Sequence, residues 1–443
     1  MEHSREYKRR VKKRIMRRRI IFAAVSIVLA AIIAVSVFSC AGKKPSEQGE
    51  SGGSIQQSAE PYVVSTAKIG SSGDILIHRP ILSGAKTSSG YDFNDILTRV
   101  SSYFSAYDYM VANLEVPCGG TEGGEYRGYP TFNCPDSIVD AFKSGGLDLF
   151  LTANNHAYDT GAKGLLRTQK VLKERSADYI GTRETADGPT FLLKDINGIK
   201  VGFACYTYET KASTAGRKAL NGILMSADAG PLVNSFNYDK LDEFYSKAKT
   251  DYNKMIESGA DAVIFYMHWG NEYQRVITKQ QKNMAQKLAD IGVDIIVGGH
   301  PHTVQPLEVL KGEKGNETVC IYSVGNLVSN QRKALMDSDG HSGHTEDGMI
   351  FEVEFEKWSN GETKIKNLDI LPLWVNLKTV SGKRVYEIAP LDLSVSDWST
   401  LGLSGNALKE AKASYNRTMK LVGEPLNNYR EKLGLEAVKT VIE

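Results

Sequence analysis

The chain has 443 residues, 41% of them hydrophobic and 24% charged, which is ordinary for a globular protein and leaves room for two or three domains or one large domain with appendages. Its formal net charge of +2 hides an asymmetry, because residues 1–19 carry ten Lys or Arg and two Glu (net +8), so the remainder has a net charge of −6. The positive charge therefore gives no support to a nucleic-acid partner, and five cysteines are too few for a disulfide framework.

Residues 20–39 form an uncharged, mainly apolar stretch. Twenty such residues are about what a helix needs to cross a bilayer, and the basic residues before them place that end in the cytoplasm. We therefore predict a single-pass anchor in the cell membrane, with a cytoplasmic tail (1–19) and the body on the extracellular side. A cleaved signal peptide and a lipoprotein processed at Cys40 are the alternatives.

Residues 40–61 are rich in Gly, Ser, Gln and Glu and are predicted to be a flexible linker. Beyond them, apolar runs typical of strands alternate with segments of helical period, which indicates an α/β fold over residues 62–375. Residues 376–443 are predicted to be a packing extension without recognisable chemistry. Strands are expected over 63–69, 109–114, 147–152, 200–206, 262–267, 293–297, 318–323, 349–355 and 365–375, and helices over 136–144, 162–175, 238–258, 278–291 and 406–421.

Two cysteines, Cys118 and Cys134, bracket a glycine-rich, polar stretch that is typical of a surface loop. In an oxidising exterior, a bond between them would close a loop worth about 3 kcal/mol. Two free thiols are the alternative, and the sequence does not decide between them. Cys205 and Cys320 lie in apolar runs and are expected in the core.

The stretch from Val293 to His302 is the most informative part of the chain. An apolar run ends on two glycines and is followed by His300-Pro301-His302. Two histidines two positions apart, at the end of a strand, can both point at one metal cluster, since imidazole is a common ligand of divalent ions. The alternative is a loop that happens to contain histidines.

Similar polar residues follow most of the other predicted strands. In open α/β sheets, ligands bind beyond the carboxyl ends of the strands, so these side chains are expected to meet at one edge. A core or capping role can explain any one of the histidines, but it is a poor explanation of all of them together. The residues concerned are Asp74, His78, Asn113, Glu115, Asn155, His156, Asp159, His268, His300, His302 and Asn326.

A set of Asp, Glu, Asn and several His is too rich in oxygen for a structural zinc site. It suits two divalent ions about 3.5–4 Å apart, bridged by a carboxylate and a hydroxide. Such a pair lowers the pKa of bound water and clamps the attacking and departing oxygens. The predicted chemistry is therefore hydrolysis, most naturally of a phosphoester.

Six motifs resemble those of the CapA family, in the family's order, over roughly residues 64–330. That family is linked to poly-γ-glutamate capsule synthesis and belongs to the calcineurin-like metallophosphoesterase superfamily. The resemblance implies a four-layer αββα sandwich with a dinuclear centre at its edge. The motifs are Gly73-Asp74, Asn113-Leu114-Glu115, Asn155-His156-x-x-Asp159-x-Gly161, His268-Trp269-Gly270-x-Glu272-Tyr273, Gly299-His300-Pro301-His302-x-x-Gln305 and Tyr322-Ser323-x-Gly325-Asn326.

The same resemblance implies roles for individual residues. Two divalent ions (Mn, Zn or Fe) would each have their own set of ligands, and Glu115 would bridge the two ions. His156 would act over the substrate as proton donor or oxyanion stabiliser, and Asp159 would orient it. The implied ligands are Asp74 and His302 for the first ion, and Asn155, His268 and His300 for the second.

One position departs from the superfamily's pattern. Its first motif usually has a histidine two residues after the aspartate, and Leu76 stands there. His78 is the nearest substitute and is a candidate metal ligand, with a role outside the ligand set as the alternative. Without it the first ion would be weakly held or absent.

The predicted function is that of an extracellular, membrane-anchored, metal-dependent hydrolase in capsule, poly-γ-glutamate or other cell-surface polymer synthesis. Its expected partners are the membrane, an anionic polymer or phosphoester substrate, and other capsule-synthesis membrane proteins. The alternative is a non-catalytic accessory subunit of a polymer synthase or exporter that binds an anionic chain in the same cleft.

Overall fold

The structure is a computed structural model that describes residues 60–211, 216–336 and 344–443. The predicted tail and anchor, and all but the last two residues of the predicted linker, lie outside these ranges. Among the residues that are described, no helix has the length and apolar character needed to cross a membrane.

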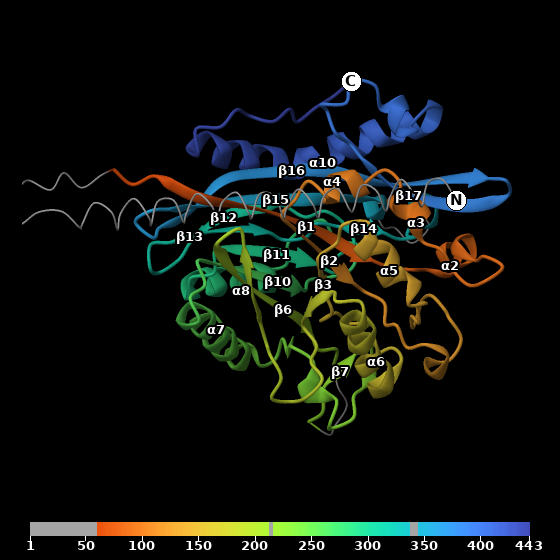
Figure 1. The fold of residues 1–443 in the computed structure, drawn as a ribbon, viewed down its shortest axis with the longest axis horizontal. Coiled ribbons are helices and arrows are strands. Elements are labelled where there is room, and N and C mark those ends of the chain that lie inside the picture. Colours follow the sequence, from red (N-terminus) through yellow and green to blue (C-terminus); the bar gives the residue numbers. More distant parts are fainter. Residues whose placement is uncertain (1–59, 212–215, 337–343) are drawn as a thin grey trace, which may run out of the picture. The chain divides into compact units, whose positions relative to one another are not determined.

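Two β-sheets organise residues 61–443, so the fold is mixed α/β as predicted (Figure 1). In the first sheet, β1 is central: it pairs in parallel with β2 and antiparallel with β15. The order of this sheet is β17 (Lys383–Pro390), β16 (Thr363–Val380), β15 (Asp347–Trp358), β1 (Val63–Ile75), β2 (Tyr109–Leu114), β3 (Leu149–Leu151) and β4 (Asp178–Ile180), and β14 (Asn326–Val328) pairs with β1.

The second sheet has a parallel centre, in which β10 pairs with β6 on one side and β11 on the other. A separate two-stranded hairpin lies outside both sheets. The order of the second sheet is β12 (Leu307–Lys311), β13 (Glu317–Ile321), β11 (Ile295–Gly299), β10 (Ala262–His268), β6 (Ile199–Tyr208) and β5 (Leu192–Ile196), with β9 (Ser235–Phe236) beside β6; the hairpin is β7 (Ala219–Leu220) with β8 (Ile223–Leu224).

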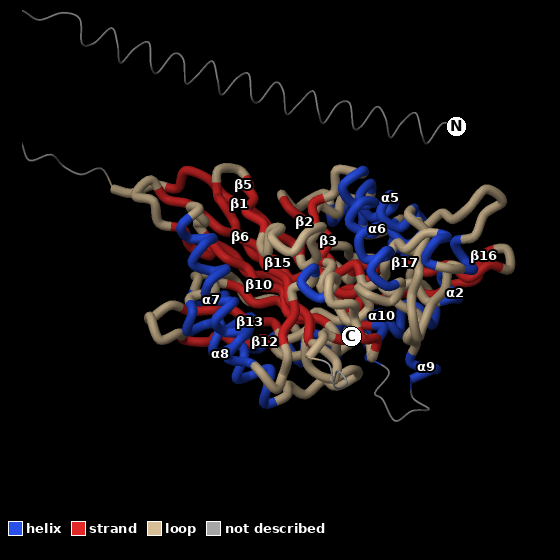
Figure 2. Tube along the Cα trace, turned by 90° about the horizontal axis from the view of Figure 1, so that it is seen from below, coloured by secondary structure: helices blue, strands red, loops and turns tan. Residues whose placement is uncertain are grey.

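Strand β10 shows how the sequence builds the layers. Its side chains alternate between two cores: Ile264 and Tyr266 join the core between the sheets, whereas Val263 and Phe265 join the core under helices α7 (Leu241–Glu257) and α8 (Lys279–Ile291). Because both faces of the strand are covered, its sequence is a continuous run of apolar residues and not an alternation of apolar and polar residues. Figure 2 shows α7 and α8 beside the strands of this sheet.

The first sheet is covered in the same way on its outer face, where a third core contains residues of the early helices and of the far side of β2. The helices of the N-terminal half are α2 (Arg79–Ala85), α3 (Asn94–Leu97), α4 (Ser101–Phe104), α5 (Ser137–Ser144) and α6 (Gly161–Glu174).

Helix α8 illustrates how the connections are defined locally. Thr278 caps its first turn through a reciprocal pair of bonds with Gln281, and Gly292 ends it with a φ of 116°. The helix leads directly into β11, so these caps help to place the turn that carries His300.

The C-terminal part completes the body. Helix α10 (Gly405–Lys432) is longer than the predicted 406–421 because it continues through Pro425, and the buried Leu426 and Tyr429 lie beyond that proline. It packs along β16 and contributes to the core between the sheets. The short helix α9 (Lys333–Met336) precedes β15.

Candidate metal centre

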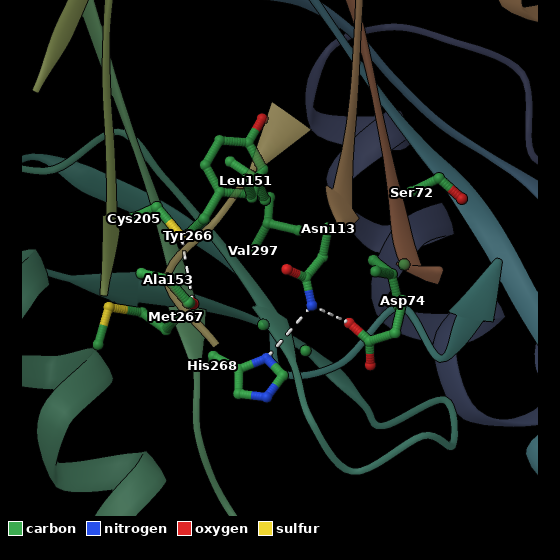
Figure 3. A pocket seen from close by; sticks show the side chains of 14 residues that line it. Ser72, Asp74, Asn113, Leu151, Ala153, Cys205, Tyr266, Met267, His268 and Val297 are labelled. Carbon is green, nitrogen blue, oxygen red and sulfur yellow. Dashed lines mark hydrogen bonds between the residues drawn. The ribbon is translucent and has the colours of Figure 1, made fainter. Parts of the chain in front are cut away.

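The carboxyl ends of β1, β2, β3, β10 and β11 lie close together and carry the polar residues that the sequence pattern singled out. The strands β1, β2 and β3 run parallel, as do β10 and β11, so their exits share an edge. Figure 3 shows Asp74 from β1, Asn113 from β2 and His268 from β10 facing one another in a pocket.

The turn after β11 brings the backbone unusually close to its neighbours. A Cβ at Gly298 would lie 1.8 Å from the backbone oxygen of Tyr322, so only glycine fits there. His300 and His302 both have positive φ angles, of 92° and 56°. Such conformations cost energy and are concentrated at functional sites. The His300 amide donates to Asp74 Oδ2 over 3.2 Å, which ties this turn to the end of β1.

Three groups of side chains have ligand atoms that all lie within 4.8 Å of one another. Glu115 is common to the first two groups, which makes it the natural bridge between two sites. Asn155 joins the second, since its Oδ1 lies 2.7 Å from His268 Nε2. The groups are Asp74, Glu115 and His302; Glu115, His268 and His300; and Glu272, His300 and His302.

Two buried atoms at this site have no hydrogen-bond partner among the described residues. They are Oε1 of Glu115, whose side chain is completely buried, and Nδ1 of His300, which is 3% exposed. The nitrogen His268 Nε2 lies 3.3 Å from Glu115 Oε1, but no hydrogen bond satisfies that oxygen. Buried polar atoms without hydrogen bonds are costly, and buried charges are usually paired or bound to metal. The donor set and these two atoms therefore fit a metal site.

The electrostatics of the cluster favour cation binding. Burial works against it, but the hydrogen bond and charge of His302 hold the pKa of Asp74 below its ordinary value. Burial, followed by the charge of Asp74, raises the pKa of Glu115 well above its ordinary value of 4.5. Burial also lowers the pKa of His268 to about 3 and that of His300 well below its ordinary value, so both imidazoles are neutral at neutral pH and offer lone pairs.

His302 is oriented by two acceptors. Its Nδ1 lies 3.1 Å from both Asp74 Oδ2 and Asn326 Oδ1. Because both neighbours are acceptors, the proton sits on Nδ1, and the other ring nitrogen faces Glu115 at 3.9 Å. This is the arrangement in which the partner of one nitrogen directs the other towards a metal.

His156 and Asp159 lie together beside this cluster. The His156 Nδ1 is 2.7 Å from Asp159 Oδ2, which also accepts from the Phe132 amide over 2.6 Å. The Phe132 ring contacts His156 edge-on at 4.7 Å between ring centroids. The glycine-rich stretch that the sequence suggested was a surface loop thus supplies two contacts to the site.

The structure does not bring His78 into any of the three groups. Its Nδ1 accepts from the Asn330 amide over 3.3 Å, and its ring contacts the edge of Phe132. Burial lowers its pKa to about 4. Leu76 points away from the site, into the core on the outer face of the first sheet.

Three further residues shape the site without having been predicted as ligands or catalytic groups, although the sequence did place Asn113 at this edge. Asn113 Nδ2 donates to Asp74 Oδ1 (2.7 Å) and Glu115 Oε2 (3.2 Å), so it bridges the two carboxylates. Tyr208, at the end of β6, packs against His300 with 4.7 Å between ring centroids. Asn221, in the hairpin between β7 and β8, donates to Asp159 Oδ1 over 2.9 Å. The strand-exit rule found Asn113 and would also have found Tyr208, whereas nothing in the sequence marks Asn221.

Cys118 and Cys134 are both buried and free, so of the two alternatives the structure has the thiols and not the bond. Cys205 and Cys320 lie in the core, as predicted.

Comparison with known proteins gives matches over most of this body. Residues 68–331 match the family described as "Bacterial capsule synthesis protein PGA_cap". The "Capsule biosynthesis protein CapA" of Bacillus anthracis is 32% identical over 317 residues, which are 71% of this chain and 68% of that protein. The "PGA biosynthesis protein CapA" of Bacillus subtilis (strain 168) is 26% identical over 303 residues, 67% of this chain and 70% of that protein.

Among solved structures, the NAD nucleotidase NadN of Haemophilus influenzae aligns with 83% of this chain and 59% of its own. The identity is 14% and the TM-score 0.42, so the description of the fold rests on the strands and helices themselves.

Proposed function

The chain belongs to the bacterial capsule synthesis family PGA_cap, and on that premise we propose that it is a metal-dependent hydrolase of a phosphoester or related bond in the synthesis of an anionic surface polymer such as poly-γ-glutamate. The fold is proposed to be the αββα sandwich of the metallophosphoesterases. The basic residues 1–19 and the apolar residues 20–39 would anchor the body outside the cell membrane, beside other membrane proteins of capsule synthesis.

The observation that supports this proposal is a pair of buried atoms without a hydrogen-bond partner among the described residues, Glu115 Oε1 and His300 Nδ1, within a shell of Asp, Asn and His. A shell kept only for packing would satisfy these atoms from within the protein. Asp74 and His302 would hold one ion, Asn155, His268 and His300 a second, and Glu115 both. Two divalent ions bound there, Mn, Zn or Fe, would supply a nucleophile at neutral pH and neutralise charge on the reacting group.

The protein's own groups provide the remaining steps. Asp74 and Asn326 hold the proton of His302 on Nδ1, which fixes the direction of that ring. Asp159 accepts from His156 Nδ1 and would pair with the doubly protonated ring, whose Nε2–H would then donate its proton to the departing oxygen of the substrate. The amide of Phe132 keeps the Asp159 carboxylate in this position.

Turnover separates this function from the alternative of a non-catalytic subunit that binds polymer. The full-length protein, supplied with Mn²⁺ or Zn²⁺, should hydrolyse bis(p-nitrophenyl) phosphate, and His302→Ala should abolish that activity. Glu257→Gln, an exposed residue at the end of α7, is the matched control and should retain it. Binding of poly-γ-glutamate without turnover in either form would support the accessory role instead.

A further inference from the structure

The loop after β10 carries Glu272, a side chain that is not buried and that faces the histidines of the metal centre. Its carboxylate lies with ligand nitrogens of His300 and His302 in a group whose atoms are all within 4.8 Å of one another. Within the described ranges, it has neither a hydrogen-bond nor an ion-pair partner. A carboxylate in this position either remains solvated or binds a cation.

The backbone of this loop is fixed against the turn that carries the two histidines. The Trp269 amide donates to Gly299 O over 3.1 Å, and the Tyr273 amide donates to Pro301 O over 2.8 Å. Between them, the Gly270 amide donates to Tyr238 Oη over 2.9 Å. Since both ends of the segment are held, the backbone that carries Glu272 lies beside the turn of His300 and His302.

The charge balance of the site calls for cations on this side. Asp74 and Glu115 already place two carboxylates in the buried cluster, and Glu272 adds a third. Three carboxylates that converge on one site repel one another unless divalent ions lie between them.

The ion proposed to lie beside His302 also has few protein ligands. Asp74, Glu115 and His302 supply three ligands, and the end of β1 offers no fourth. Leu76 is buried in the outer core, and His78 belongs to none of the three groups of possible ligands.

We propose that Glu272 is a ligand of the metal centre, coordinating an ion from the solvent side of His300 and His302 and supplying the donor that β1 lacks. The inference rests on the metal centre of the proposed function. A third carboxylate makes the ligand set richer in oxygen. Oxygen ligands suit Mn²⁺, whereas imidazole ligands suit Zn²⁺. Glu272 therefore biases the centre towards Mn²⁺.

Metal binding tests this directly. Full-length protein, stripped with a chelator, would be titrated with Mn²⁺ by calorimetry and by the electron paramagnetic resonance of free Mn²⁺. The wild type should bind two Mn²⁺. In Glu272→Gln the Kd of one of them should rise by about 100-fold or more, since even residues that only orient a ligand are worth about 10–100-fold. Glu272→His should recover a second site, now with Zn²⁺ preferred over Mn²⁺.

Glu257→Gln serves as the matched control, because it removes the same charge from an exposed position on α7 and should leave both sites unchanged. Circular dichroism of the metal-free proteins checks that all variants fold. Two Mn²⁺ bound by Glu272→Gln with wild-type Kd values would overturn the role of Glu272 while leaving the centre intact. A wild type that binds no Mn²⁺ or Zn²⁺ would overturn the centre and this inference together.

Discussion

The buried carboxylate of Glu115 should destabilise the metal-free protein and should stabilise the protein when the proposed ions are bound. It is completely buried, its Oε1 has no hydrogen-bond partner among the described residues, and Asp74 is its neighbour. Burial and the charge of Asp74 raise its pKa well above 4.5. A folded-state pKa above the unfolded value means that the contribution of this group to stability is fully present below about pH 4.5 and is lost as the pH rises through the folded-state pKa.

Glu115→Gln should therefore make the metal-free protein more stable at pH 7.5. Leaving a buried polar group unsatisfied costs about 1–3 kcal/mol, and this is the gain expected from removing the charge while keeping the shape. At about 2 °C per kcal/mol for a body of this size, Tm should rise by about 2–6 °C. The gain should shrink as the pH is lowered towards 4.5, because the wild-type carboxyl then becomes protonated.

With metal present the order should reverse. Each ion at 100 times its Kd stabilises the folded state by about 2.7 kcal/mol, or about 5.4 kcal/mol for two, and Glu115→Gln should forgo most of this because it lacks the proposed bridging ligand. That loss exceeds the gain of about 1–3 kcal/mol from removing the buried charge. Thermal unfolding of the wild type and of Glu115→Gln, each in chelator and in Mn²⁺ and between pH 5 and 8, gives the four Tm values to be compared. A variant that is less stable than the wild type in chelator, or that gains as much Tm from Mn²⁺, would refute the reasoning.

Three further changes probe other parts of the account. Asp159→Asn removes the carboxylate that orients His156, so kcat should fall by about 10²–10⁴-fold with metal content unchanged; loss of metal would show a structural role instead. Gly298→Ala places a Cβ 1.8 Å from a backbone oxygen and should cost at least about 1–3 kcal/mol in chemical denaturation, whereas Gly230→Ala, with no atom closer than 3.7 Å, should cost much less. Burial raises the pKa of Cys118 to about 12, so iodoacetamide at pH 8 should label it only after denaturation; rapid labelling of the native protein, or none after denaturation without reductant, would contradict the buried free thiol.

The strand exits were predictable because one physical rule governs them. Parallel strands place their carboxyl ends at a common edge, so Asp74, Glu115 and His268 could be expected to meet although they are far apart in the chain. The helices between these strands were equally readable, since their apolar spacing and terminal glycines mark them. The predicted 278–291, for example, corresponds to α8 at Lys279–Ile291.

The contacts made by the loops could not be predicted in this way. Asn221 reaches Asp159 only because a hairpin of four paired residues folds over the site, and no periodicity records that contact. The sequence offered His78 as a ligand because it is the nearest histidine to Asp74, but the bond from the Asn330 amide turns its Nδ1 elsewhere. Likewise, α10 passes through Pro425, where a proline would ordinarily end a helix, because the buried side chains beyond it pack against the body.

The central claim is that one edge of two facing sheets holds a pair of divalent cations. Elemental analysis of the purified protein, wild type beside His300→Ala, after reconstitution and removal of loosely bound metal, tests it most directly. We expect close to two ions per wild-type chain and clearly fewer in the variant. A wild type that stays free of metal, or a variant with the same content, would contradict the claim.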